Sequence, residues 1–160
     1  MSHLRISRRD HFSPIIPAGQ CDLVLGLEPM EGLRVLTSHG NQETFVLVNI
    51  RPVHPIDVIA GHAEYPELSV LLENIQKMSR KVWILNATEI ALQMGNPILS
   101  NIVMMGALSG LAIFPIDERD FLNVAGELLP AQALKLNAAA FNEGKKAVRK
   151  LLPNQGYGLS

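Results

Sequence analysis

A chain of 160 residues is long enough for one domain with its own core, and 48% hydrophobic against 18% charged residues excludes a disordered tail. The formal net charge of −1 provides no basic field for nucleic acid or acidic lipid, so we expect neither a polynucleotide nor a membrane partner. The longest apolar stretch, residues 102–116, is shorter than the roughly twenty residues of a membrane-spanning helix, and the first residues contain no signal region. We therefore expect a cytoplasmic protein of a single domain, residues 1–160.

The first half of the chain alternates between strand and helix patterns. Residues 2–16 alternate apolar and polar side chains on either side of Arg8-Arg9-Asp10, which predicts an N-terminal β-hairpin. Residues 23–27 are apolar on both faces, as in a sheet covered on both sides. A helix should begin at Pro29, and a second buried strand over 45–48 should lead to Asn49 and the rigid loop 51–55.

The second half continues the alternation and then becomes helical. Residues 66–78 place four apolar side chains on one helical face, and residues 82–85 predict a third strand. A short helix over 88–94 is broken at 95–97. Residues 101–114 predict a helix that is apolar nearly all round and therefore buried, and two amphipathic helices follow within 115–130 and over 131–152. The fold class is therefore α/β, a three-layer sandwich with a mainly parallel central sheet.

Polar residues cluster where the predicted strands end, and this edge of a parallel sheet is where ligands bind. The residues at such ends are Glu28, Asn49, Arg51, Asn86 and Thr88. Glu28 opens a turn in which Pro29 presets the helix and Glu31 complements its dipole, while Gly26 costs strand stability unless something must approach closely there. Two interpretations remain open, a binding site and a well-capped strand-to-helix turn.

Other residues offer little chemistry of their own. The five histidines show no metal-ligand spacing, and no glycine-rich phosphate loop occurs, so we expect no metal site. The only cysteine, Cys21, cannot form an internal disulfide and is more typical of core packing than of a nucleophile. Gly106 and Gly110, four residues apart, are more typical of close helix packing than of ligand contact.

Several ordered segments are similar to a known family. The most specific are Leu27-Glu28-Pro29 with Glu31 and Arg34, Val48-Asn49 with Arg51-Pro52, and Gly95-Asn96-Pro97 followed by Asn101 and Gly106-Ala107-Leu108. From Ser2 to about Leu151 the chain resembles the gamma subunit of 2-oxoacid:ferredoxin oxidoreductases, and most of all the form found as the beta subunit of indolepyruvate:ferredoxin oxidoreductase.

The resemblance implies a subunit of an indolepyruvate- or pyruvate-type enzyme that decarboxylates a 2-oxo acid to acyl-coenzyme A and passes electrons to ferredoxin. Thiamine diphosphate and [4Fe-4S] clusters would belong to a larger partner subunit, so this chain would bind no cofactor and be inactive alone, with self-association possible. No catalytic residue is implied here. The ligand- or partner-facing candidates are Glu28, Glu31, Asn49, Arg51, Asn96 and Asn101. The alternative is a non-catalytic α/β assembly or binding module derived from the same family.

One departure from the family concerns the start of the chain. Members of the family begin with a strand, a Gly-x-Gly-Gly-x-Gly turn and a helix before the segment that corresponds to Ser2–Ile6. Here Met1 directly precedes that segment, so about one strand-helix unit of roughly thirty residues is missing. A start further upstream, a trimmed chain and a shortened paralogue are the three explanations.

Overall fold

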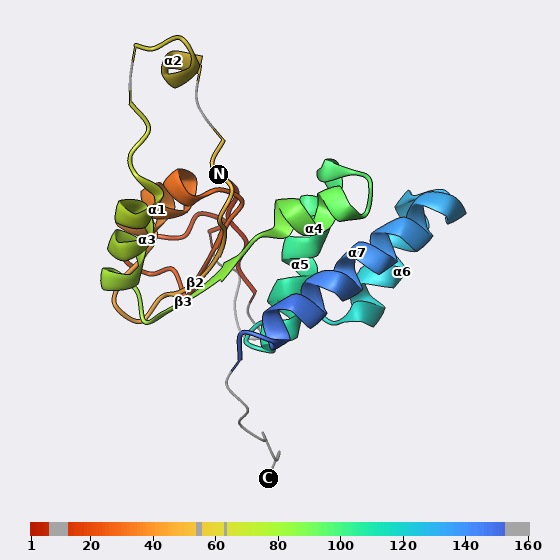
Figure 1. The fold of residues 1–160 in the computed structure, drawn as a ribbon. Coiled ribbons are helices and arrows are strands. Elements are labelled where there is room, and N and C mark those ends of the chain that lie inside the picture. Colours follow the sequence, from red (N-terminus) through yellow and green to blue (C-terminus); the bar gives the residue numbers. More distant parts are fainter. Residues whose placement is uncertain (7–12, 54–55, 63, 153–160) are drawn as a thin grey trace. The chain divides into compact units, whose positions relative to one another are not determined.

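The computed structural model describes residues 1–6, 13–53, 56–62 and 64–152, and it forms two compact units, residues 1–84 and 85–160. The first unit contains the parallel sheet, in the order β1 (Leu23–Gly26), β2 (Phe45–Asn49) and β3 (Lys81–Leu85) (Figure 1). Leu23 pairs with Phe45 and Gly26 with Val48. The predicted α/β class and the three adjacent parallel strands are confirmed.

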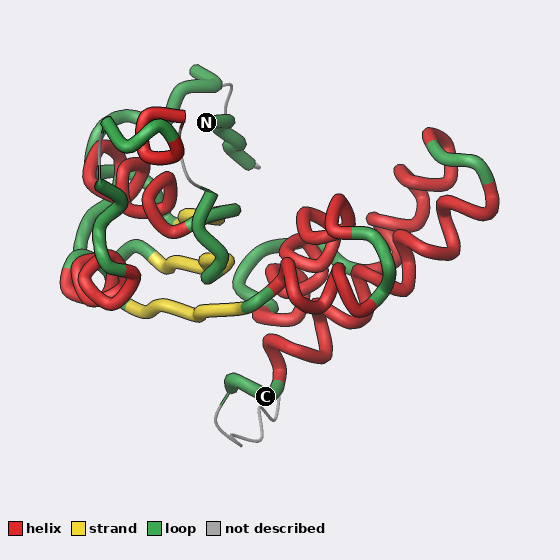
Figure 2. Tube along the Cα trace, turned by 45° about the horizontal axis from the view of Figure 1, so that its top comes forward, coloured by secondary structure: helices red, strands yellow, loops and turns green. Residues whose placement is uncertain are grey.

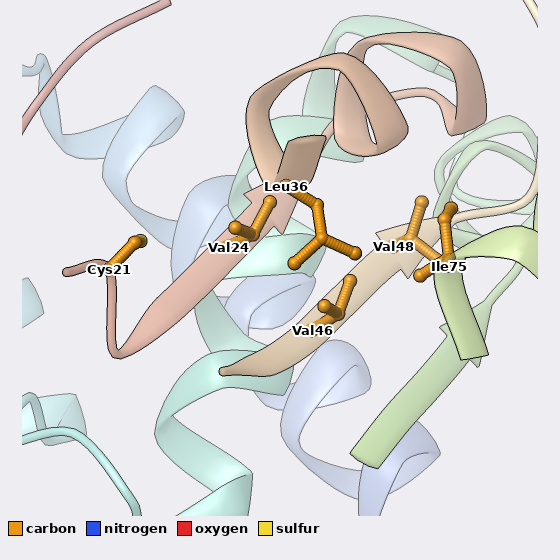
Figure 3. Packing of buried hydrophobic residues seen from close by; sticks show 6 residues of the cluster. All are labelled: Cys21, Val24, Leu36, Val46, Val48 and Ile75. Carbon is orange, nitrogen blue, oxygen red and sulfur yellow. The ribbon is translucent and has the colours of Figure 1, made fainter. Parts of the chain in front are cut away.

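Helices α1 (Pro29–His39) and α3 (Leu68–Lys77) pack against each other, and α1 also packs on β1 and β2. Alternation along the strands directs Val24, Val46 and Val48 to the face that meets these helices. Figure 3 shows Leu36 of α1 among these valines, with Ile75 of α3 and Cys21 completing the cluster. The strands are short, so their stability comes from this buried face rather than from the ladder alone.

The second unit is helical apart from the last residue of β3 (Figure 2). Its elements are α4 (Ala87–Gln93), the 3-10 helix η1 (Pro97–Leu99), α5 (Ser100–Leu111), α6 (Glu118–Leu128) and α7 (Ala131–Arg149). Helix α5 carries eight buried residues and packs mainly on α7, which confirms the predicted buried helix. Each unit therefore has its own core.

Glycines allow the backbones of α5 and α7 to contact each other directly. A Cβ added at Gly106 would lie 1.8 Å from the carbonyl oxygen of Phe141, and one at Gly144 would lie 1.9 Å from that of Val103. At Gly110 the nearest atom would be Cγ1 of Val148, at 2.6 Å. The prediction that Gly106 and Gly110 serve close helix packing is confirmed.

The N-terminal hairpin is not formed by the described residues of that segment. Residues 1–6 and 13–16 contain no strand, and 7–12 lie outside the described residues. The two segments are joined by side chains instead, since Arg5 Nη1 donates to the carbonyl oxygen of Ser13 at 2.9 Å and the Ile16 amide donates to Nδ1 of His3 at 3.2 Å. Pro14 has no amide hydrogen to donate to a strand ladder, which accounts for the difference.

Smaller differences concern element ends. The buried helix ends at Leu111 rather than at residue 114, because Ala112 adopts a left-handed conformation with φ of 55°. The last helix ends at Arg149 rather than 152, and the short helix α2 (Ile56–Ile59) and η1 were not predicted. A helical layer on the second face of the sheet and a single domain over 1–160 stay predictions.

Candidate functional site at the first strand-to-helix turn

Two glycines set the geometry of the turn between β1 and α1. A Cβ at Gly26 would lie 3.1 Å from Cα of Gly32 and 3.1 Å from Cγ2 of Val48. The first turn of α1 therefore sits directly against the end of β1, closer than side chains would allow. This is the close approach that a glycine inside a strand suggests, and its partner is the helix of the same unit.

Glu28 caps α1 with its side chain. Its carboxylate accepts hydrogen bonds from the amides of Met30, at 3.1 Å, and Glu31. Amides at the start of a helix lack partners within the helix, so these bonds satisfy two of the exposed donors. Only 9% of Glu28 is exposed, which means that the carboxylate is turned into the protein. The interpretation as a capped turn is thereby confirmed.

Tyr65 adds a contact from a distant part of the chain. Its hydroxyl donates to Oε2 of Glu28 at 2.9 Å, across 37 positions of sequence. Burial, followed by the hydrogen bond and charge of Glu28, raises the pKa of Tyr65 to about 12. The tyrosine therefore stays protonated at neutral pH and donates to the carboxylate. Periodicity and position at a strand end do not single out Tyr65, and its one signal in the sequence is the Tyr65-Pro66 pair just before α3.

Asn49 and Arg51 lie at the end of β2 and beyond it. Asn49 is 4% exposed, and its Nδ2 donates to the carbonyl oxygen of Leu27 at 3.1 Å. This bond joins the ends of β1 and β2 just before Glu28. Arg51 is exposed. The structure thus places Glu28 and Asn49 around one turn, facing inward, with Arg51 on the surface.

Glu31 and Arg34 form an exposed ion pair one turn into α1. Arg34 Nε donates to Oε1 of Glu31 at 3.0 Å, and the second nitrogen of the fork reaches Oε2. The guanidinium holds the pKa of Glu31 below its usual range. Both side chains are half exposed, so water screens the pair and its contribution to stability is small. Unlike the carboxylate of Glu28, the carboxylate of Glu31 faces the solvent.

The remaining candidates belong to the second unit. Asn96 is the N-cap of η1, where its Oδ1 accepts from the Ile98 amide at 3.1 Å, and Asn101 is exposed in the first turn of α5. Asn86 caps α4 in the same manner, accepting from the amide of Glu89 at 3.1 Å. The structure therefore brings Glu28, Glu31 and Asn49 together, with Arg51 two residues beyond Asn49, and gives Asn96 a local capping role.

The turn offers fixed polar side chains at the edge of the sheet. Among the described residues no group of three or more His, Cys, Asp and Glu side chains could hold a metal ion.

Cys21 is 5% exposed in the core cluster, and burial raises the pKa of its thiol, which confirms the packing interpretation. In the described part of the chain no helix is long and apolar enough to cross a membrane.

The model of a protein family described as pyruvate ferredoxin/flavodoxin oxidoreductase matches residues 1–147. The chain belongs to this family. Two curated relatives have the name indolepyruvate oxidoreductase subunit IorB. The one from Thermococcus kodakarensis is 31% identical over 144 residues, which cover 89% of this chain and 71% of the relative. The one from Archaeoglobus fulgidus is 34% identical over 142 residues, covering 89% and 69%. The resemblance seen in the sequence motifs is confirmed.

Two solved structures share the fold of this chain. The gamma subunit of a keto/oxoacid ferredoxin oxidoreductase from Geobacter sulfurreducens aligns with a TM-score of 0.54 at 19% identity, over 81% of this chain and 65% of that chain. Pyruvate oxidoreductase subunit PORC from Thermotoga maritima gives 0.54 at 18% identity, over 79% and 62%. The chain thus spans slightly less than two thirds of the length of both structures.

Proposed function

We propose that this chain is the gamma-type subunit of a 2-oxoacid:ferredoxin oxidoreductase that acts on indolepyruvate or pyruvate in the cytoplasm. The observation that carries the proposal is the family match, which runs through residues 1–147 and so includes both compact units. The names of the relatives, which are subunits of indolepyruvate oxidoreductases, support the substrate class. In this proposal the chain supports oxidative decarboxylation to acyl-coenzyme A and transfer of electrons to ferredoxin.

The donor set of the chain supports the proposal that the iron–sulfur clusters belong to another subunit. A [4Fe-4S] cluster is held by about four cysteine thiolates, and this sequence has one cysteine, which is buried. The residues of this chain therefore do not fit a cluster. Decarboxylation of a 2-oxo acid needs an electron sink such as thiamine diphosphate, which side chains do not supply. We assign both groups to a larger companion subunit and propose that this chain alone has no turnover.

The six candidate residues divide by orientation into two roles in this proposal. Glu28 and Asn49 face inward and fix the turn, whereas Glu31 and Arg51 are exposed and present charges to a ligand or to the companion subunit. In the second unit Asn96 caps η1, as Glu28 caps α1, whereas Asn101 is exposed at the start of α5 and offers a neutral amide to a ligand or to the companion subunit. None of the six is assigned a step in the chemistry.

The test is reconstitution with the proposed companion subunit, a chain that binds thiamine diphosphate and iron–sulfur clusters. Dye reduction that depends on indolepyruvate or pyruvate and on coenzyme A should require both chains. Pyruvate and indolepyruvate, assayed separately, report the substrate class. Turnover by this chain alone would refute the subunit proposal, and a matched companion that never binds would leave a non-catalytic assembly module as the better explanation.

A further inference from the structure

The helices of the second unit enclose an apolar groove that the proposed chemistry does not use. Its volume is about 440 Å³, and it lies among side chains of α5, α6 and α7. Ile102 and Met105 of α5 form one side, three residues apart and therefore on one helical face. The face of α6 that contains Val124 and Leu128 forms the other side.

The floor of the groove is part of the packed core of the unit. Phe121 of α6 stacks on Phe141 of α7, with ring centroids 4.5 Å apart and planes 15° from parallel. Phe121 is 8% exposed, Ala125 is 7% exposed and Phe141 is fully buried. A floor made of buried, stacked side chains keeps its shape, so the groove is preformed rather than a transient gap.

The wall on α6 is apolar and yet faces water. Val124 is 59% exposed and Leu128 is 75% exposed, one helical turn apart. A single exposed apolar side chain is ordinary in a soluble protein, but two adjacent ones beside an apolar groove form a continuous patch of the kind that binds other proteins. From Asp120 to Leu128 this wall rises about 12 Å, enough for a little over two turns of a docked helix.

The charges around the groove have one sign. Asp120 and Glu127 share the helical face of Val124 and Leu128, and among the residues that the structure describes no lysine or arginine lines the groove. The single basic residue of α6, Arg119, is five positions before Val124, about 140° around the helix, and so points away from this face. A segment with apolar anchors and basic flanks would complement this surface.

The two polar side chains that line the groove already serve their own helices. Asp120 accepts from the amide of Asp117 at 3.3 Å in a capping box, and Asn137 Nδ2 donates to the carbonyl oxygen of Ala133 at 2.8 Å. A small-molecule site usually offers a few convergent polar groups that orient the ligand. A groove whose lining is apolar apart from these two side chains, with acidic residues at its rim, is better suited to an amphipathic helix, whose apolar anchors recur every three or four residues.

We propose that this groove binds a basic amphipathic helix of the companion oxidoreductase subunit. The inference rests on the proposed function, because it takes the existence of the companion from it. Apolar side chains of the companion helix fill the space between Met105, Val124 and Leu128, and its lysine or arginine side chains lie next to Asp120 and Glu127. The groove is thus part of the surface that assembles the enzyme.

The experiment measures the affinity of the purified chain for the companion subunit by calorimetry. The double variant Val124→Gln/Leu128→Gln keeps good helix-forming residues but removes the apolar wall, and its Kd should rise at least about tenfold, as expected for the loss of two anchors. The matched control is Val70→Gln/Leu92→Gln, which changes side chains that are 47% and 42% exposed on α3 and α4. The control should bind within about twofold of the wild type.

A second comparison tests the charge. Glu127→Lys should weaken binding, and the difference from the wild type should shrink at high salt, because exposed charges are screened. Equal affinities for the wild type and the groove variant would overturn the inference and leave the proposed function intact. Self-association that Val124→Gln/Leu128→Gln abolishes, with companion binding unchanged, would assign the groove to a second copy and overturn it as well. A companion that does not bind the wild type would refute the proposed function itself.

Discussion

In the described part of the chain, three hydrogen-bond donors surround the carboxylate of Glu28, and they indicate what this residue does. Two are the amides of Met30 and Glu31 and the third is the hydroxyl of Tyr65. A carboxylate that accepts three bonds, with 9% of the residue exposed, acts first as an organiser of the turn. Any ligand at this edge would then meet Arg51 or Glu31 before Glu28.

The substitution Tyr65→Phe should show how much the hydrogen bond from Tyr65 to Glu28 contributes to the unfolding free energy, and this contribution should depend on pH. At neutral pH the variant should lose about 1–2 kcal/mol of unfolding free energy, because a hydrogen bond to a charged group disappears. The folded pKa of Tyr65, about 12, exceeds its ordinary value of 10.0. The stabilising contribution is therefore complete below pH 10 and declines as the pH rises from 10 toward 12, where only the unfolded chain has released the proton.

The measurement is urea unfolding of both proteins between pH 7 and 12, with the difference in free energy plotted against pH. Other ionisable groups are common to both proteins, so their contributions cancel in the difference. A difference that stays constant through pH 12 would show that Tyr65 does not donate to Glu28.

Part of this site could be predicted from the sequence. Glu28 and Asn49 follow apolar runs, and the ends of parallel strands meet at one edge, so their proximity follows from topology. The capping role of Glu28 follows from Pro29 at the first helical position. Tyr65 could not be found in this way, because a hydrogen bond across 37 positions depends on how the long β2–α3 connection returns to the sheet, and periodicity has no information on that path.

At the scale of elements, the contact between α5 and α7 depends on glycines, which have no side chain. Gly106→Ala should lower the unfolding free energy by about 3 kcal/mol or more, because the new Cβ would lie 1.8 Å from the Phe141 carbonyl oxygen and two helix backbones would have to separate. Thermal or urea unfolding of the purified variant measures the loss.

The matched control for that change is Gly126→Ala in α6. There the added Cβ meets only Cδ2 of Leu134, at 3.8 Å, which is an ordinary contact. Alanine is the better helix former, so this variant should gain about 0.5–1 kcal/mol. Equal effects at the two positions would mean that the helices tolerate a wider spacing than the structure shows.

Periodicity predicted the elements well wherever burial follows a regular pattern. The strands at 23–26 and 45–49 and the buried helix from 100 differ from the predictions by no more than one residue at five of their six ends. The errors occur where a local event overrides the pattern. Apolar residues continue past Leu111, but the left-handed conformation of Ala112 ends the helix, and no glycine marks the stop. Pro14 interrupts a segment whose alternation suggested a strand.

At the scale of the whole molecule, the buried cysteine bears on the proposal that the iron–sulfur clusters belong to the companion subunit. Cys21 belongs to the core of the first unit, and its Sγ donates to the carbonyl oxygen of Leu23 at 3.0 Å. A thiol in that position is committed to packing and cannot reach a cluster without unfolding the core around Val24 and Leu36.

Cys21→Ala in the reconstituted complex tests this distribution of parts. The variant chain should lose about 1 kcal/mol of stability, comparable to deleting one buried methyl group. The iron content of the complex, its absorption near 400 nm and its turnover per assembled complex should match the wild type, since every cluster ligand would come from the companion subunit. A loss of iron with normal assembly would instead make Cys21 a cluster ligand. This chain, and not only the companion subunit, would then hold that cluster.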